Sequence, residues 1–199
     1  CVAEQLGWTQ FALLGHSLGA IVSVVIAGSF PERVTRLALI DGIVLRTGAE
    51  ADAAERMGQA LQAQLDLQHK RKSVHPTLDR AIEARMKGMV AVSREAAEFL
   101  AQRGLMPVPG GYSWRSDSRL TLPSPLRLSD EQAMSFVRRV SCPTTLVVAE
   151  QGMLASHSDL LDRLPFNLER LPGGHHLHLN DDAGAIFVAD SFNRFFAVP

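Results

Sequence analysis

The segment at residues 11–20 constrains this chain more than any other, and it reads Phe-Ala-Leu-Leu-Gly-His-Ser-Leu-Gly-Ala. An apolar stretch of strand character ends at Gly15, and a long apolar segment begins at Ala20. A G-x-S-x-G pattern between a strand and a helix is typical of a nucleophile elbow. We expect Gly15 and Gly19 to let the strand and helix backbones approach closely. The pattern predicts that Ser17 is a nucleophile at the helix N-terminus, where backbone N–H groups favour negative charge.

The residues around the elbow alternate between strands and helices. Residues 8–14 are predicted to form a strand, residues 17–30 a buried helix, and residues 34–40 a second strand that ends at Asp41. Nearly continuous apolar strands that alternate with helices are typical of a parallel sheet covered on both faces. This part of the chain therefore predicts an α/β fold.

The alternation stops for almost a hundred residues and then returns. Helices are predicted at residues 49–72, 76–92, 93–103 and 129–140, with a proline-rich loop at 105–128. Strands are again predicted at 144–149 and 166–171, before a closing helix at 183–196. We interpret the chain as an α/β core at 1–46 and 141–199, interrupted by a helical cap at 47–140. Because the insertion follows a strand end, we expect it to cover the edge of the sheet where ligands bind.

A serine hydroxyl is a weak nucleophile and needs a base. His175 follows the Gly173-Gly174 pair after the last predicted strand, so its loop leaves the same edge of the sheet as Ser17. We predict that His175 is the base, with His178 as the second candidate. His176 is expected to pack in the loop or to support its neighbour.

Six segments carry a resemblance to a known family. They read Gly-His-Ser-Leu-Gly-Ala at 15–20, Phe-Pro-Glu-Arg-Val at 30–34, Leu-Ile-Asp at 39–41, Gly-Gly-Tyr-Ser-Trp-Arg-Ser-Asp at 110–117, Cys-Pro-Thr-Thr-Leu-Val-Val-Ala at 142–149 and Pro-Gly-Gly-His-His-Leu-His-Leu at 172–179. With them the chain resembles the α/β-hydrolase superfamily, and within it the serine-hydrolase-like proteins that carry a helical cap. The resemblance implies that Ser17 is the nucleophile, that His175 is the base and that the N–H of Leu18 is an oxyanion-hole donor.

The acid of the triad is not fixed by the resemblance. Most of the family places an aspartate in a Gly-x-x-Asp pattern after the strand that corresponds to residues 144–149, but Gly152 stands at that position here. Two substitutes remain. Asp41 ends the neighbouring strand, a position from which some members of the family take their acid, and Glu150 lies two residues before the usual place. We favour Asp41 and keep Glu150 as the alternative.

The resemblance also implies a reaction. We expect a serine hydrolase that cleaves a carboxylic ester, or a related acyl bond, of a small apolar substrate through an acyl-enzyme. A C–C bond hydrolase of dienoate type and a non-catalytic ligand-binding protein on the same fold are the alternatives. His16, Tyr112 and Trp114 are expected to line the substrate pocket.

No cofactor is expected, because the chain has no G-x-G-x-x-G, Walker or C-x-x-C pattern. No metal site is expected either, because the histidines at 175, 176 and 178 have no carboxylate partner at ligand spacing.

We expect a small-molecule substrate as the partner, and neither nucleic acid nor a membrane. The 20 basic and 21 acidic side chains are balanced, which gives no reason to expect nucleic acid or a membrane surface as a partner. Two cysteines do not make a disulfide framework, and together with the absence of a visible signal peptide they favour a cytoplasmic location.

The residues before Ser17 are too few to form the strands that precede the elbow in the family. A second oxyanion donor from a His-Gly segment is also not found there. We therefore expect an N-terminal segment or a second chain to complete the sheet.

Overall fold

The computed structural model describes residues 2–44 and 52–197, which fall into two compact units. The first unit is Cys1–Arg46 with Leu128–Pro199, and the second is Thr47–Arg127. The predicted boundary between residues 46 and 47 lies outside the described residues. The predicted cap end at residue 140 was wrong, because helix α6 (Asp130–Arg139) belongs to the first unit. Its apolar side chains Ala133, Met134 and Val137 are buried there.

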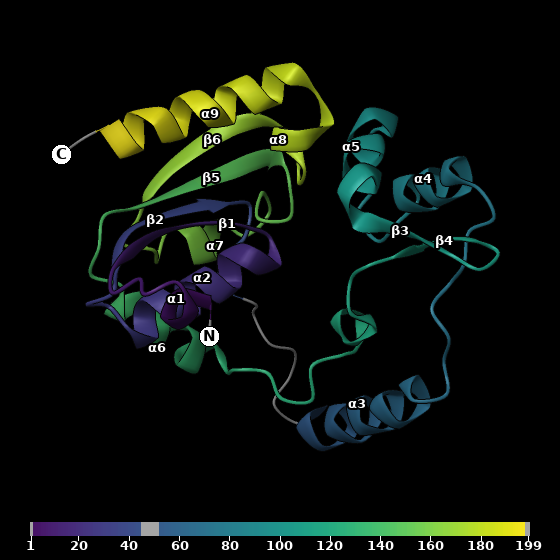
Figure 1. The fold of residues 1–199 in the computed structure, drawn as a ribbon. Helices are drawn as coiled ribbons and strands as arrows, with labels where there is room; N and C mark the ends of the chain where they lie inside the picture. Colours follow the sequence, from purple (N-terminus) through teal and green to yellow (C-terminus); the bar gives the residue numbers. More distant parts are fainter. Residues whose placement is uncertain (1, 45–51, 198–199) are drawn as a thin grey trace. The chain divides into compact units, whose positions relative to one another are not determined.

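The first unit is built on a parallel four-stranded sheet. Its strands are β1 (Phe11–His16), β2 (Val34–Ile40), β5 (Thr144–Gln151) and β6 (Asn167–Gly174), in the order β1-β2-β5-β6 (Figure 1). Each pair of neighbouring strands is parallel. The predicted α/β class, with a mainly parallel sheet flanked by helices, is confirmed.

Alternate residues of the inner strands face two different hydrophobic clusters. In β2, Leu37 and Leu39 pack with helix α2 (Leu18–Ser29), helix α6 and the short helix α7 (Ser158–Leu161). Ala38 and Ile40 instead pack with the short helix α8 (Leu177–Asn180) and helix α9 (Asp182–Ala197) on the opposite face (Figure 1). Burial on both faces explains why these strands read as continuous apolar runs.

Strand β1 lies at one edge of the sheet that the described residues form. It pairs with β2, and its side chain Leu14 is 56% exposed, whereas β2 and β5 are almost entirely buried. Helix α1 (Val2–Gln5) precedes it. The expectation that a further segment or a second chain pairs with this edge stays a prediction.

Helices α2 and α6 approach each other closely at Gly28. A Cβ atom there would lie 2.5 Å from the carbonyl oxygen of Phe136, so the Gly28→Ala variant has to push the helices apart. We expect this variant to lower the free energy of unfolding by about 1–3 kcal/mol, measured by urea denaturation. Gly19→Ala is the matched control in the same helix, because a Cβ there meets nothing within 4 Å. It should be neutral or stabilise by up to about 1 kcal/mol. Equal stability of the two variants would contradict the prediction.

The second unit contains helices and a hairpin. Its helices are α3 (Ala53–Leu67), α4 (Leu78–Met86), α5 (Arg94–Gly104) and a 3₁₀ turn at Ser118–Thr121. The predicted start of the first of these helices at residue 49 lies outside the described residues. Strands β3 (Leu105–Val108) and β4 (Gly111–Trp114) form an antiparallel pair, so the prediction of a loop over 105–128 was wrong at its start. Gly110, in the tight turn between the two strands, has a φ of 88°, which favours glycine, and Gly111, the first residue of β4, also has a positive φ.

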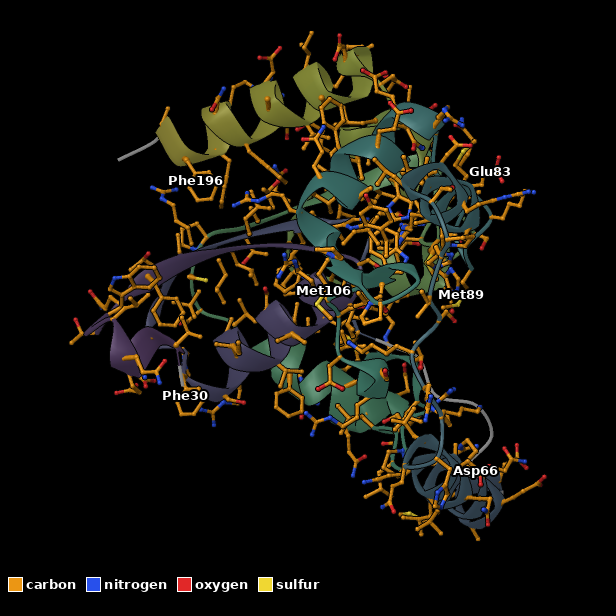
Figure 2. All side chains as sticks on the ribbon, turned by 45° about the vertical axis from the view of Figure 1, so that its right-hand side comes forward. Phe30, Asp66, Glu83, Met89, Met106 and Phe196 are labelled. Atoms are coloured by element: carbon orange, nitrogen blue, oxygen red, sulfur yellow. The ribbon has the colours of Figure 1, made fainter. Side chains whose placement is uncertain are left out.

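Large apolar side chains are exposed in both units. Phe30 and Phe196 in the first unit and Met89 in the second are examples (Figure 2). Individually exposed apolar residues are ordinary on protein surfaces. Among the helices of the described ranges, none has the length and apolar character needed to cross a membrane.

Candidate active site

Ser17 is the single residue between strand β1 and helix α2. Its backbone has φ 53° and ψ −118°, an unusual conformation for a residue with a side chain. A Cβ at Gly15 would lie 2.5 Å from the carbonyl oxygen of Gly19, so the expected close approach is present at Gly15. The expectation for Gly19 was wrong, because a Cβ there meets nothing within 4 Å. The N–H of Ser17 donates to the carbonyl oxygen of Ile40 at 3.0 Å, which fixes the elbow to β2.

Three parallel strands bring Ser17, His175 and Asp41 together. Ser17 follows β1, Asp41 follows β2 and His175 follows β6, so all three leave the same edge of the sheet. Nε2 of His175 lies 2.8 Å from Oγ of Ser17, and Nδ1 lies 2.6 Å from Oδ2 of Asp41. The side chains of His175 and Asp41 are buried. The carboxylate can only accept, so Nδ1 carries the hydrogen and Nε2 presents its lone pair to the hydroxyl.

Backbone donors hold the carboxylate of Asp41 in place. Oδ2 accepts the N–H of Met153 at 2.8 Å, and Oδ1 accepts those of Ala149 and Leu154 at 3.4 Å. Asp41 has a positive φ of 41°. Ala149 lies in β5, and Met153 and Leu154 follow it closely. The segment in which the resemblance places the acid therefore binds the carboxylate of Asp41, which follows β2.

Of the two predicted acids, the structure places Asp41, not Glu150, beside His175. Glu150 lies in β5 with an exposed side chain. The structure also explains why position 152 is a glycine. A Cβ at Gly152 would overlap Oδ2 and Oδ1 of Asp41. The carboxylate of Asp41 fills the space that a side chain at position 152 would need.

Leu18 is the first residue of helix α2. Its N–H belongs to the first helical turn, whose N–H groups have no partner inside the helix. The N–H groups of Ala20 and Ile21 donate to the carbonyl oxygen of Ser17 at 3.0 and 3.2 Å. The predicted role of Leu18 in the oxyanion hole is compatible with this position and stays a prediction.

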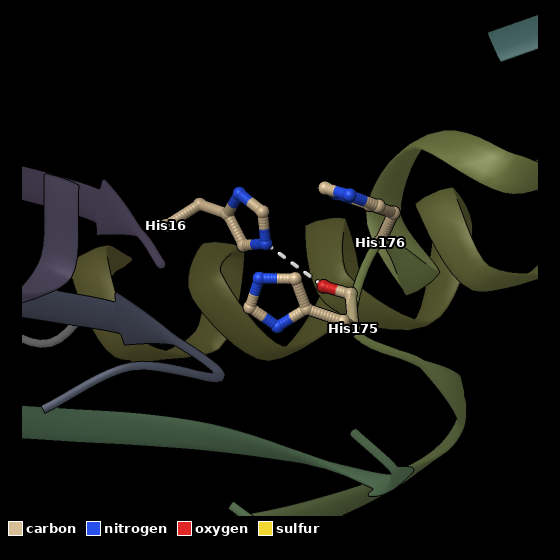
Figure 3. Close-up of side chains that lie close together, drawn as sticks. All are labelled: His16, His175 and His176. Carbon is tan, nitrogen blue, oxygen red and sulfur yellow. Dashed lines mark hydrogen bonds between the residues drawn. The ribbon is translucent and has the colours of Figure 1, made fainter. Parts of the chain in front are cut away.

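A cluster of histidine rings surrounds His175. Nε2 of His16 donates to the carbonyl oxygen of His175 at 2.8 Å (Figure 3). The ring centroid of His16 lies 4.6 Å from that of His175, 5.1 Å from that of His176 and 4.5 Å from that of His178. His16 therefore contacts the histidine loop, a contact that its predicted place in the substrate pocket did not include.

Burial determines the charge of two rings in this cluster. It lowers the pKa of His16 below its usual value, and it lowers the pKa of His178 to about 4. Both rings are therefore neutral at pH 7. As a result, a positive charge that forms on His175 meets no fixed cation on these two neighbours.

A cavity of about 290 Å³ opens beside Ser17 and Asp41. Apolar side chains dominate its wall, and they include Leu18, Ile21, Ile43, Leu154 and Leu160. Sequence reasoning named Leu18 only as an oxyanion donor and missed the other four, because they come from α2, the segment after β2 and the segment after β5. A signal for them was the apolar pair Ile43-Val44, which follows Asp41 and Gly42.

Tyr112 and Trp114 lie in the hairpin of the second unit. Tyr112 pairs with the backbone of His75, and the Trp114 ring lies against Gly104. Their predicted place in the substrate pocket stays a prediction.

The comparisons with known proteins agree with this geometry. The family model described as alpha/beta hydrolase fold matches residues 1–182. The chain belongs to this family. A hypothetical protein from Pseudomonas aeruginosa PAO1, known from its crystal structure, is 62% identical in sequence to this α/β-hydrolase chain. The two structures match with a TM-score of 0.93 over 98% of this chain and 71% of that one. A serine hydrolase-like protein of Danio rerio is 24% identical over 204 residues, which cover 96% of this chain.

The fold recurs in more distant structures. The thioesterase domain from the curacin biosynthetic pathway is 23% identical, with a TM-score of 0.71 over 94% of this α/β-hydrolase chain and 68% of that domain. This likeness shows a shared fold. The matched region spans 63% of the length of the Danio rerio relative.

Proposed function

We propose that this α/β-hydrolase is a serine hydrolase that cleaves the carboxylic ester of a small, apolar acid through an acyl-enzyme. One observation carries the proposal, namely the chain of hydrogen bonds from Ser17 through His175 to Asp41, with distances of 2.8 and 2.6 Å. A hydroxyl, an imidazole and a buried carboxylate in this order are the parts that nucleophilic catalysis by serine requires.

In the proposed reaction, Oγ of Ser17 attacks the carbonyl carbon of the ester while Nε2 of His175 takes its proton. Asp41 keeps the hydrogen on Nδ1 and stabilises the imidazolium that forms. The N–H of Leu18 donates to the oxyanion of the tetrahedral intermediate. His175 then protonates the leaving alcohol, and a water molecule activated by the same nitrogen releases the acid from Ser17.

The apolar cavity beside Ser17 supports the proposed class of acyl group. Its volume of about 290 Å³ and its aliphatic wall suit a short hydrocarbon chain, because burying apolar surface is favourable and burying an unpaired polar group is costly.

Narrowing this cavity should change the preferred acyl length. Ile21 lies in α2 and is only half-buried, so its side chain can be enlarged without filling a packed core position. We expect Ile21→Trp to lower kcat/KM for p-nitrophenyl octanoate at least about tenfold relative to the acetate, since a few lost methylene contacts are worth 1–3 kcal/mol. Phe30→Trp, at the exposed end of the same helix, is the control. An unchanged ratio in the Ile21 variant would place the acyl group elsewhere.

Labelling with a fluorophosphonate probe tests the catalytic proposal. The protein should be labelled at Ser17, located by peptide mapping, and labelling should disappear in Ser17→Ala. It should become much slower in His175→Ala, because the base is lost. Labelling of the His175 variant at the wild-type rate would contradict the proposal. Absence of labelling in the wild type would favour the alternative of a non-catalytic ligand-binding protein on the same fold.

A further inference from the structure

The histidine cluster combines side chains from opposite ends of the sequence. His16 ends β1, and His175 and His176 follow β6, so His16 and His175 are 159 positions apart in the sequence. One ring nitrogen of each of these three residues lies within 4.8 Å of the other two (Figure 3). His16 and His176 are half-buried, whereas His175 is buried.

Hydrogen bonds already orient two of these rings. Nδ1 of His175 donates to Asp41, which leaves its lone pair on Nε2. Nε2 of His16 donates to a carbonyl oxygen, which leaves the lone pair of the neutral ring on Nδ1. Metal-binding histidines almost always donate their second nitrogen to a carboxylate or a backbone carbonyl in this way. The Asp41–His175 pair and the His16 contact provide both kinds of support.

We propose that His16, His175 and His176 bind a divalent transition metal ion such as Zn²⁺, and that the bound ion inhibits the hydrolase. The metal site stands on the histidines alone, and its inhibitory effect rests on the proposed function. Zinc binds imidazole nitrogen at about 2.0–2.1 Å, so a tetrahedral site needs its nitrogens roughly 3.4 Å apart. The nitrogens now lie within 4.8 Å of one another, and rotation of the half-buried His16 and His176 rings shortens these distances. A water molecule takes the fourth position.

Inhibition follows from the single lone pair of His175. Nε2 is the nitrogen that accepts the proton of Ser17, and Nδ1 is occupied by the buried carboxylate of Asp41. A metal ion at Nε2 takes the lone pair that the base needs. Metal binding and activation of Ser17 therefore exclude each other.

No metal site was expected from the sequence, and the reason lies in the third ligand. Spacing within residues 175–178 offers no partner carboxylate, whereas His16 is provided by a different strand. The site is a property of the sheet edge and not of a local motif.

Isothermal titration calorimetry with Zn²⁺ tests the metal site without any reference to activity. The wild type should bind one ion per chain. His16→Gln and His176→Gln should each weaken binding at least about tenfold, since changes even in groups that support a ligand cost 10–100-fold. His69→Gln, which removes an exposed histidine of the second unit, should leave the affinity unchanged. No binding by the wild type, or equal binding by all the variants, would overturn the site.

Two further measurements separate the metal site from the catalytic proposal. Ser17→Ala should bind Zn²⁺ with nearly the wild-type affinity, because serine is not one of the three ligands. Zinc at saturation should slow fluorophosphonate labelling of the wild type at least about tenfold, since general base catalysis contributes about 10²–10⁴-fold and a metal-bound Nε2 cannot take the proton of Ser17. EDTA should restore the rate. His176→Gln, compared with its own metal-free rate, should be less inhibited.

The outcomes are distinguishable. Zinc binding without slower labelling would show that His175 is not a ligand and would overturn the proposal. A metal-free wild type that is not labelled would refute the proposed hydrolase function, while calorimetry with wild type and Ser17→Ala would still decide the metal site.

Discussion

The Asp41→Asn variant is expected to lose about 10⁴-fold in the rate of acylation, measured in a single turnover with an activated ester. The carboxylate of Asp41 accepts the hydrogen of Nδ1 of His175 at 2.6 Å. An amide at this position can donate to Nδ1 instead, which moves the imidazole hydrogen to Nε2 and removes the lone pair that faces Ser17. The defect should appear in kcat far more than in KM.

Glu150→Gln is the matched control, because Glu150 was the other predicted acid and its side chain is exposed on β5. It should retain wild-type acylation within about twofold, as expected for an exposed side chain away from the reacting atoms. Circular dichroism should show that both variants are folded. A large loss in the glutamine variant, with a small loss in the asparagine variant, would reverse the assignment of the acid.

The second large effect concerns the position at which the resemblance places the acid. Gly152→Asp is expected to be both less stable and nearly inactive, because its side chain would overlap the carboxylate of Asp41 and add a second buried negative charge. In the double variant Asp41→Gly/Gly152→Asp, the new carboxylate enters the space that the old one leaves. Glycine also tolerates the positive φ of position 41.

The double variant should therefore acylate at least about tenfold faster than Asp41→Gly alone, which corresponds to a coupling of about 1–3 kcal/mol between the two positions. Asp41→Gly/Gly152→Asn is the control with the same shape and no carboxylate, and it should show no such gain. If the two double variants react equally slowly, a carboxylate from β5 does not reach His175.

The nucleophile and the base could be predicted because their signals are local. Ser17 is marked by its neighbours in the elbow, and His175 by a Gly-Gly pair after an apolar strand. The parallel sheet followed from the same continuous apolar strands. Asp41 could be named only as one of two candidates, because the choice depends on which strand end reaches His175. That distance is set by the register of β2, β5 and β6.

Features that depend on long-range packing could not be predicted. Helix α6 has the same polar-apolar pattern as the helices of the second unit, and only its contact with α2 assigns it to the first unit. The approach of His16 to the histidine loop brings together strand ends that are far apart in the sequence. The segment that forms β3 and β4 contains prolines and glycines, which are typical of loops, so the sequence predicted a loop there and not a hairpin.

The candidate site connects residues that are 158 positions apart in the chain and come from three of the four strands of its sheet. No part of the chain that folds alone can therefore place His175 beside Ser17. During refolding, helices can form and the chain can collapse before the serine acquires its base, because loops this long close late. The helical circular dichroism signal and the rate of fluorophosphonate labelling can be measured at the same times during refolding. We expect the labelling rate to recover later than the helical signal. The labelling rate would then report when the strands that carry Ser17 and His175 have assembled into one sheet.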